Sequence, residues 1–185
     1  LVVSAFLSIR DPRERPMDKE QAATDFHRSL DDKSSDFFGI LNIWNYLWEH
    51  HAFDSNRLLR NVCKSGYFSF VRVREWRNLV LDLADTMEYT EDIKSAPLPH
   101  PEHFHGAILS GIPRNMGVFD KENRFYRSTG GRKFFLFPGS ALSRKKPAPE
   151  WVMSFAIVET SKVFARINAE IKPELLEEVA PHLCV

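Results

Sequence analysis

The sequence has 185 residues and carries 25 basic and 25 acidic side chains, so its formal net charge is zero. Hydrophobic residues make up 43% and charged residues 27%, which is typical of a globular protein and excludes a disordered chain. No apolar run approaches the roughly 20 residues that a membrane-spanning helix needs. A balanced charge also argues against a nucleic-acid-binding protein, whose surface is usually basic.

The two cysteines, Cys63 and Cys184, form no CxxC pair, so neither a disulfide framework nor a cysteine zinc site is expected. This cysteine usage favours a reducing, cytoplasmic setting. The chain opens on what looks like the buried end of a helix, which suggests a piece of a longer protein.

The first 93 residues have the apolar spacing of helices. Residues 36–50 place apolar side chains three and four positions apart, and Asp36 or one of the two preceding serines can cap this helix. Similar spacing predicts helices over 55–63 and 69–88. The sequence therefore predicts a helical first half, with Trp76 in its core.

A proline-rich segment follows the helices. Residues 94–101 hold three prolines in eight positions, so we expect an exposed, extended linker, followed by a short helix at about 102–112. Beyond that helix the apolar period changes from 3.6 to 2, which predicts β-strands. The strand candidates cover residues 123–128, 132–137, 150–159 and 162–171. A helix that begins with Pro173 closes the chain.

The last strand candidate indicates which side chains face the core. Alternate residues from Val163 to Ile171 are apolar and should point inward, and we also assign Phe125 and Phe135 to the core. The expected polar outer face consists of Phe164, Arg166, Asn168 and Glu170. The predicted fold class is α+β, with a helical bundle over 1–112 and a small antiparallel barrel with a closing helix over 113–185. A barrel of this size suggests an OB-fold, which binds oligonucleotides.

Positive charge is concentrated in the predicted barrel. Residues 114–172 hold twelve Lys or Arg and five Asp or Glu, a local excess of +7, whereas residues 1–113 have an excess of −4. Basic groups neutralise phosphates, and interleaved aromatic rings can stack on bases. The candidate contacts in the barrel are Arg132, Lys133, Arg144, Lys145, Lys146, Lys162 and Arg166. A solvated loop is the competing interpretation for the run at 144–146.

The chain contains no catalytic motif. It has no phosphate-binding loop, no dinucleotide-binding glycine turn, no HExxH and no GxSxG. His100, His103 and His105 could bind a metal, but their proline-flanked setting favours a linker and the start of a helix. We therefore expect neither catalytic residues nor a metal or cofactor in this chain.

Several long phrases resemble one family. In the first half these are LSIRDPRERP (7–16), SDFFGILNIWNYL (35–47) and FSFVRVREWRNL (68–79). In the second half these are FPGSAL (137–142), PEWVMSFAIVETSKVFAR (149–166) and the IKPELLEEVAPHL that begins at Ile171. Together they resemble the helical accessory region and the C-terminal OB-fold of DEAH-box ATP-dependent RNA helicases, and are closest to the bacterial, HrpA-type branch.

The resemblance implies a larger parent protein. Two RecA-like motor domains would bind ATP and magnesium and step along single-stranded RNA, while this chain would form part of the helical ratchet (also called HA2) and the OB-fold that grip the strand. The chain alone would neither hydrolyse ATP nor unwind RNA. Its expected partners are single-stranded RNA, with DNA left open, and the motor domains; we expect a monomer without membrane contact.

The resemblance also implies particular contact residues. The segment that binds RNA backbone in eukaryotic relatives lacks its histidine here, which leaves Ser140 and the amides of Gly139 and Ser140. Thr160 and Lys162 match a Thr-Ser-Lys phrase, although Thr160 could instead cap a strand end. Arg72 and Arg74 match an Arg-x-Arg-Glu-Trp phrase of the ratchet.

A second function, of a different class, remains open from the sequence. The loop at 143–149 could dock a protein that regulates the motor, and contact with RNA would then be incidental.

Overall fold

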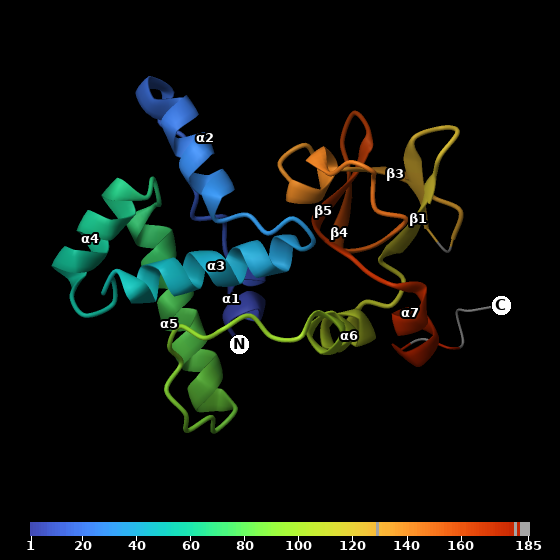
Figure 1. The fold of residues 1–185 in the computed structure, drawn as a ribbon. Coiled ribbons are helices and arrows are strands. Elements are labelled where there is room, and N and C mark those ends of the chain that lie inside the picture. Colours follow the sequence, from blue (N-terminus) through green and yellow to red (C-terminus); the bar gives the residue numbers. More distant parts are fainter. Residues whose placement is uncertain (129, 180, 182–185) are drawn as a thin grey trace. The chain divides into compact units, whose positions relative to one another are not determined.

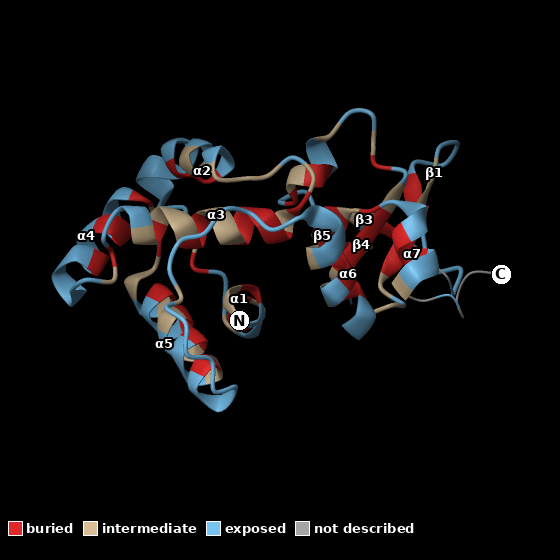
Figure 2. Ribbon diagram, turned by 60° about the horizontal axis from the view of Figure 1, so that its bottom comes forward, coloured by how far each residue is buried: buried red, intermediate tan, exposed pale blue. Residues whose placement is uncertain are grey.

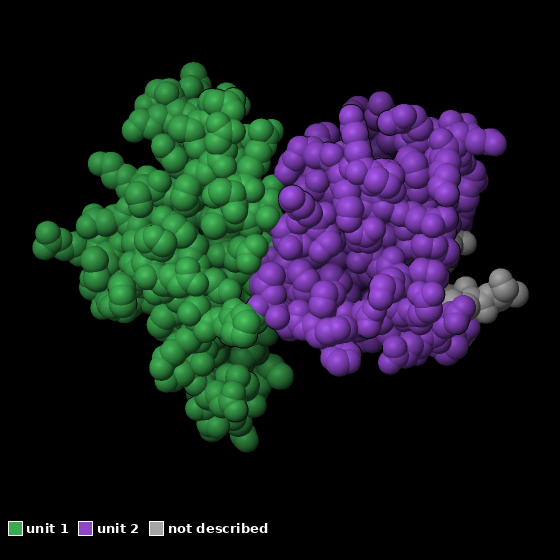
Figure 3. All heavy atoms as spheres, viewed as in Figure 1, with its two compact units in different colours: residues 1–31, 39–97 green, residues 32–38, 98–185 purple. Residues whose placement is uncertain are grey.

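The structure is a computed structural model that describes residues 1–128, 130–179 and 181 (Figure 1). Its contacts divide the chain into two compact units (Figure 3). Unit 1 consists of residues 1–31 and 39–97, and unit 2 of residues 32–38 and 98–185. These units do not coincide with a division at residue 112, because the helix before the barrel and residues 32–38 group with the barrel. The predicted division into a helical domain over 1–112 and a barrel domain over 113–185 therefore stays a prediction.

Unit 1 is helical, as the apolar spacing predicted. Its elements are α1 (Val2–Ser8), η1 (Met17–Lys19), α2 (Glu20–Ser29), most of α3 (Asp36–Glu49), α4 (Asn56–Ser65) and α5 (Phe70–Thr86). Trp76 is fully buried, and its indole Nε1 donates a hydrogen bond to the carbonyl of Val2 at 2.9 Å. The rings of Phe6 and Trp44 lie edge-on to it, at 5.0 and 5.1 Å between centroids. The prediction that Trp76 belongs to the core is confirmed.

Unit 2 holds a closed five-stranded barrel. Around the barrel the strands follow the order β1 (Met116–Asp120), β2 (Phe125–Arg127), β3 (Lys133–Leu136), β5 (Val163–Glu170) and β4 (Trp151–Glu159). Neighbouring strands are antiparallel except β3 and β5, which run parallel. The α+β class is therefore confirmed, with a barrel that is mostly antiparallel. The described part of unit 2 also contains the first turn of α3 and the short helices α6 (Pro101–Gly111), η2 (Ala141–Arg144) and α7 (Pro173–Val179).

The barrel core has a central cluster from β2, β3, β4, β5 and η2, and Phe119 of β1 packs against it. Buried residues occur along the strands and in the helices (Figure 2). Its central cluster consists of Tyr126, Phe134, Leu142, Val152 and Ala165. The ring of Phe134 lies against the backbone of Gly117, where an added Cβ would collide with the ring. Only glycine therefore fits at this point of β1 without a shift of the core.

The sequence assigns two side chains to the wrong face of their strands: Phe135 to the core and Asn168 to the outer face. Phe134 is fully buried and Phe135 is 37% exposed, the reverse of the expected phase. Two adjacent phenylalanines leave the phase of a strand open, and the pairing of Phe134 with Tyr126 decides it. Asn168 is fully buried rather than on the outer face. The residue before it, Ile167, has a left-handed φ of 56°, which breaks the alternation of side chains along β5.

One strand was missed altogether. The four strand candidates correspond to β2, β3, β4 and β5, but β1 was not expected because its sequence, Met-Gly-Val-Phe-Asp, has no alternation of apolar and polar residues. Pairing with β2 and β4 on its two sides stabilises it instead. In the described part of the chain, no helix has both the length and the hydrophobicity needed to cross a membrane.

Candidate nucleic-acid interface

Three phenylalanines form an aromatic strip on the outer side of β3 and β5. The strip consists of Phe135, Phe137 and Phe164. Phe135 lies opposite Phe164 in the parallel pairing of the two strands, and Phe137 directly follows β3. Phe135 and Phe137 are each 37% exposed. Because residues alternate between the two faces of a strand, the burial of Phe134 leaves Phe135 outside. Exposed rings of this kind can stack on nucleic-acid bases.

Two cations lie over the rings of this strip. Lys162 Nζ is 5.3 Å from the centre of the Phe135 ring, and Arg166 Cζ is 4.6 Å from that of Phe137. Both side chains are exposed, and neither has a carboxylate partner among the described residues. Cation–π contact positions each charge beside a stacking surface without neutralising it. A strand of nucleic acid along the strip would find rings for its bases and cations for its phosphates.

The other candidate cations near β3 and β5 differ in their partners. Arg132 forms an ion pair with Glu159, with Nη2 and Oε2 2.9 Å apart. Lys133 Nζ lies 4.9 Å from the centre of the Phe125 ring, which is buried as expected. At the hairpin between β4 and β5, the exposed hydroxyl of Thr160 donates to the carbonyl of Lys162 at 3.2 Å.

Ser140 is held inside unit 2 rather than displayed on its surface. It is 4% exposed, and its hydroxyl donates to Oδ2 of Asp36 at 2.6 Å. The amide of Ser140 donates to the carbonyl of Phe137 at 2.9 Å, so that amide is engaged within the turn. Gly139 lies exposed in the same turn. The geometry gives Ser140 a part in positioning the turn that follows the aromatic strip.

Asp36 is a positioning residue that sequence reasoning treated only as a helix cap. Its carboxylate accepts hydrogen bonds from the amide of Ala141 at 2.9 Å and from that of Asn168 at 2.8 Å, besides the hydroxyl of Ser140. Three donors on one carboxylate join the start of η2 to the kink in β5. No local pattern could have identified this role, because the donors are more than a hundred residues away from Asp36 in the sequence.

The loop cations at 144–146 differ in their surroundings. Arg144 is exposed and lies 3.4 Å from the carbonyl of Ser140. Lys145 is half-buried and forms an ion pair with Glu170. Lys146 is exposed and has no carboxylate partner in the described part of the chain. Lys146 is therefore the loop cation that is most available to an anionic ligand.

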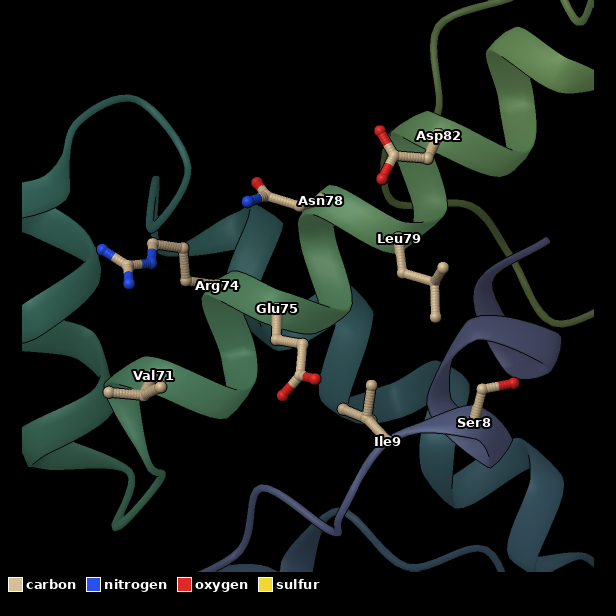
Figure 4. Close-up of a pocket in the computed structure, with 8 residues that line it drawn as sticks. All are labelled: Ser8, Ile9, Val71, Arg74, Glu75, Asn78, Leu79 and Asp82. Carbon is tan, nitrogen blue, oxygen red and sulfur yellow. The ribbon is translucent and has the colours of Figure 1, made fainter.

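Arg72 and Arg74 lie on α5 in unit 1. Arg72 donates to the carbonyl of Asp11 at 3.0 Å, and Arg74 lies 5.3 Å from the centre of the Phe70 ring. Arg74 also lines a hollow of about 520 Å³ (Figure 4), together with Ser8, Ile9, Val71, Glu75, Asn78, Leu79 and Asp82. Two carboxylates share this hollow with one arginine, so its charge does not favour an anion.

The histidines of the 100–105 segment do not converge on a common point. His105 is buried, and its Nε2 lies 2.8 Å from the hydroxyl of Ser35, whereas the rings of His100 and His103 contact each other at 5.0 Å between centroids. Burial lowers the pKa of His105 to about 4, against a smaller opposing effect of Asp32. Among the described residues, no group of three His, Cys, Asp or Glu side chains could hold a metal ion. Cys63 is buried in α4, and Cys184 lies outside the described residues.

Comparison with known proteins agrees with the barrel topology. Residues 104–183 match the family model of the oligonucleotide/oligosaccharide-binding (OB) fold. The class of the molecule is therefore a helical region followed by an OB-fold. Over 184 residues the chain is 40% identical to the ATP-dependent RNA helicase HrpA of Escherichia coli and 39% identical to the HrpA homolog of Haemophilus influenzae.

A more distant relative is the pre-mRNA-splicing factor ATP-dependent RNA helicase prp22 of Schizosaccharomyces pombe, 26% identical over 183 residues. The three alignments cover 98 or 99% of this chain but only 14 or 15% of each relative. Over nearly its whole length the chain is similar to one region of HrpA-type ATP-dependent RNA helicases, a region with a helical part and an OB-fold.

Proposed function

We propose that the chain is the part of an ATP-dependent RNA helicase that grips single-stranded RNA, which lies along the aromatic strip of the OB-fold. The observation that carries this proposal is the pair of exposed rings, Phe135 and Phe137, each with a cation over it that has no carboxylate partner among the described residues. The rings would stack on successive bases, and Lys162 and Arg166 would neutralise phosphates. Neither interaction reads base identity, so binding would tolerate many sequences.

The motor that drives this grip would lie elsewhere in the parent protein. The names of the relatives describe ATP-dependent RNA helicases, and this chain corresponds to about 14% of their length. RecA-like domains would bind ATP and magnesium and supply hydrolysis, while this region holds the strand in place. The chain alone would then bind RNA without hydrolysing ATP.

A pair of arginine substitutions tests the proposed interface. Arg166→Ala removes a free cation from the strip, whereas Arg132→Ala removes a cation that Glu159 already compensates. We expect Arg166→Ala to weaken binding of a single-stranded RNA about 3- to 10-fold at low salt, and to reduce the slope of log K against log salt by about 0.7. Fluorescence anisotropy across a salt series measures both quantities.

The matched arginine variant separates the site from general charge loss. Arg132→Ala lowers the local charge by the same one unit, but the Arg132 guanidinium is held by Glu159 rather than over a ring of the strip, so the RNA affinity should change by less than twofold. Equal losses in the two variants would overturn the site assignment. Loss of a bound partner protein on substitution of residues 144–146, with RNA affinity intact, would support the alternative of a protein-docking platform.

A further inference from the structure

A hollow in unit 2 lies beside the aromatic strip. It has a volume of about 580 Å³, which lies within the usual range of small-ligand sites. Three parts of the barrel line it: β1 and β2 with the turn between them, β3, and the segment from η2 to Ala148. The side chains that matter to the argument are Phe119, Tyr126, Phe135, Arg124 and Lys146.

The hollow combines aromatic walls with a positive charge. Phe119 and Tyr126 contact each other with ring centroids 5.1 Å apart, and the partly exposed Phe135 contributes a third ring. Four cations line the hollow and no Asp or Glu does. Lys121 pairs with Glu150 and Lys145 with Glu170, but Arg124 and Lys146 have no carboxylate partner within the described ranges. An anionic ligand with a flat apolar part would satisfy both features.

We propose that this hollow binds one nucleotide of the RNA strand that lies on the aromatic strip, and thus rest this inference on the proposed function. The base would insert between Phe119 and Phe135, and its phosphate would lie at Arg124 and Lys146. Phe135 belongs to both the strip and the hollow, so a strand on the strip reaches the hollow without a break. An acidic peptide would use the cations and leave the aromatic walls without a partner, so the chemistry favours a nucleotide.

If the hollow holds one base, the binding affinity should depend on that base of the strand more than on any other. RNA oligonucleotides of about ten nucleotides, each with one abasic position, can locate it by anisotropy titration of the 185-residue chain. We expect one position at which the missing base weakens binding about fivefold or more, and smaller losses elsewhere. Uniform effects along the strand would overturn the proposal.

The cations of the hollow provide the second measurement. The double variant Arg124→Gln/Lys146→Gln should weaken binding of the intact RNA about tenfold and abolish the special sensitivity at the abasic position. Its control, Arg127→Gln, removes a nearby cation that pairs with Asp120 at 3.3 Å, and it should keep that sensitivity. All three positions are exposed, so the variants should fold, which circular dichroism can check.

The outcomes separate this proposal from the function on which it rests. If Arg166→Ala weakens RNA binding but the double variant does not, the strip binds RNA and the nucleotide hollow is refuted. If neither change affects RNA binding, both proposals fail. Competition by an Asp-rich or Glu-rich peptide that is lost in the double variant, without any sensitive abasic position, would assign the hollow to a peptide and overturn the nucleotide.

Discussion

At the scale of single residues, unit 2 depends on polar groups that are buried and paired. Asp36 accepts three hydrogen bonds, and Asn168 and Ser154 bond to each other through their side chains at 2.7 Å. His105 and Ser35 form a further buried polar pair. The Ser35 hydroxyl accepts a hydrogen bond from the amide of Phe38 at 3.3 Å, so its own proton is available to donate to Nε2 of His105. Such groups stabilise the fold only while their protonation states match the bonds they make.

His105 makes the stability of the protein depend on pH. Its pKa is about 4 in the folded protein and about 6.5 when unfolded, so the unfolded state binds more protons between these values. The free energy of unfolding should therefore fall as the pH drops below 6.5, by about 3 kcal/mol at pH 4, and this loss should level off below pH 4. Chemical denaturation at several pH values measures the effect.

An exposed histidine of the same helix is the natural control. His103→Gln should retain the loss of stability between pH 6.5 and pH 4, whereas His105→Gln should remove most of it. Burial also lowers the pKa of His27, which leaves a residual pH dependence in the His105 variant. NMR titration of the wild-type imidazole gives an independent check if His105→Gln does not fold. A His105 that is protonated at pH 5.5 in the folded protein would contradict the expectation.

At the scale of elements, the phase of β3 decides which phenylalanine stabilises the barrel and which can meet a ligand. Phe134 stacks on Tyr126 inside, with ring centroids 5.7 Å apart, whereas Phe135 lies under Lys162 outside. The two residues are adjacent and chemically identical, so only the pairing of the strand distinguishes them. Their substitutions should therefore have opposite effects on stability and binding.

We expect Phe134→Ala to lower the free energy of unfolding by about 3 to 5 kcal/mol, because it leaves a cavity in the barrel core. Phe135→Ala should cost less than about 1 kcal/mol and should instead weaken RNA binding. Urea denaturation and anisotropy titration on the two variants measure these quantities. A larger loss of stability in Phe135→Ala would show that the phase of β3 is reversed.

At the scale of the whole molecule, zero net charge conceals an uneven distribution. The +7 excess of residues 114–172 is balanced by acidic excesses on both sides of it in the sequence. Association with a polyanion responds to the local field more than to the total charge, because salt screens charges beyond about 10 Å. A neutral chain can therefore bind RNA through one basic surface.

Two variants of equal net charge test this local effect. Lys162→Glu and Lys19→Glu both change the net charge to −2, the first over the aromatic strip and the second on the exposed η1 of unit 1. At pH 8 and moderate salt, Lys162→Glu should weaken RNA binding tenfold or more, while Lys19→Glu should stay within about twofold of wild type. Similar losses in both variants would show that total charge governs binding.

The helices α3 to α7, four of the five strands and the basic character of the barrel could be predicted from the sequence, because they follow from residue periods of 3.6 and 2, from the position of Pro173 and from counting charges. No range was predicted for α2, η1 or η2. Lys162 and Arg166 could also be named as candidate contacts in this way. The resemblance of long phrases to HrpA-type helicases identified the family, and the comparisons agree with it.

Only the tertiary structure could decide what depends on pairing between distant segments. The parallel contact of β3 with β5 brings Phe135 and Phe164 together, the kink at Ile167 turns Asn168 inward, and Asp36 binds donors far along the chain. The hollow beside Phe135 likewise takes its walls from three separate parts of the barrel. A local pattern records the period of a segment but not its partners, and the partners determine which side chains are buried, paired or left free to bind.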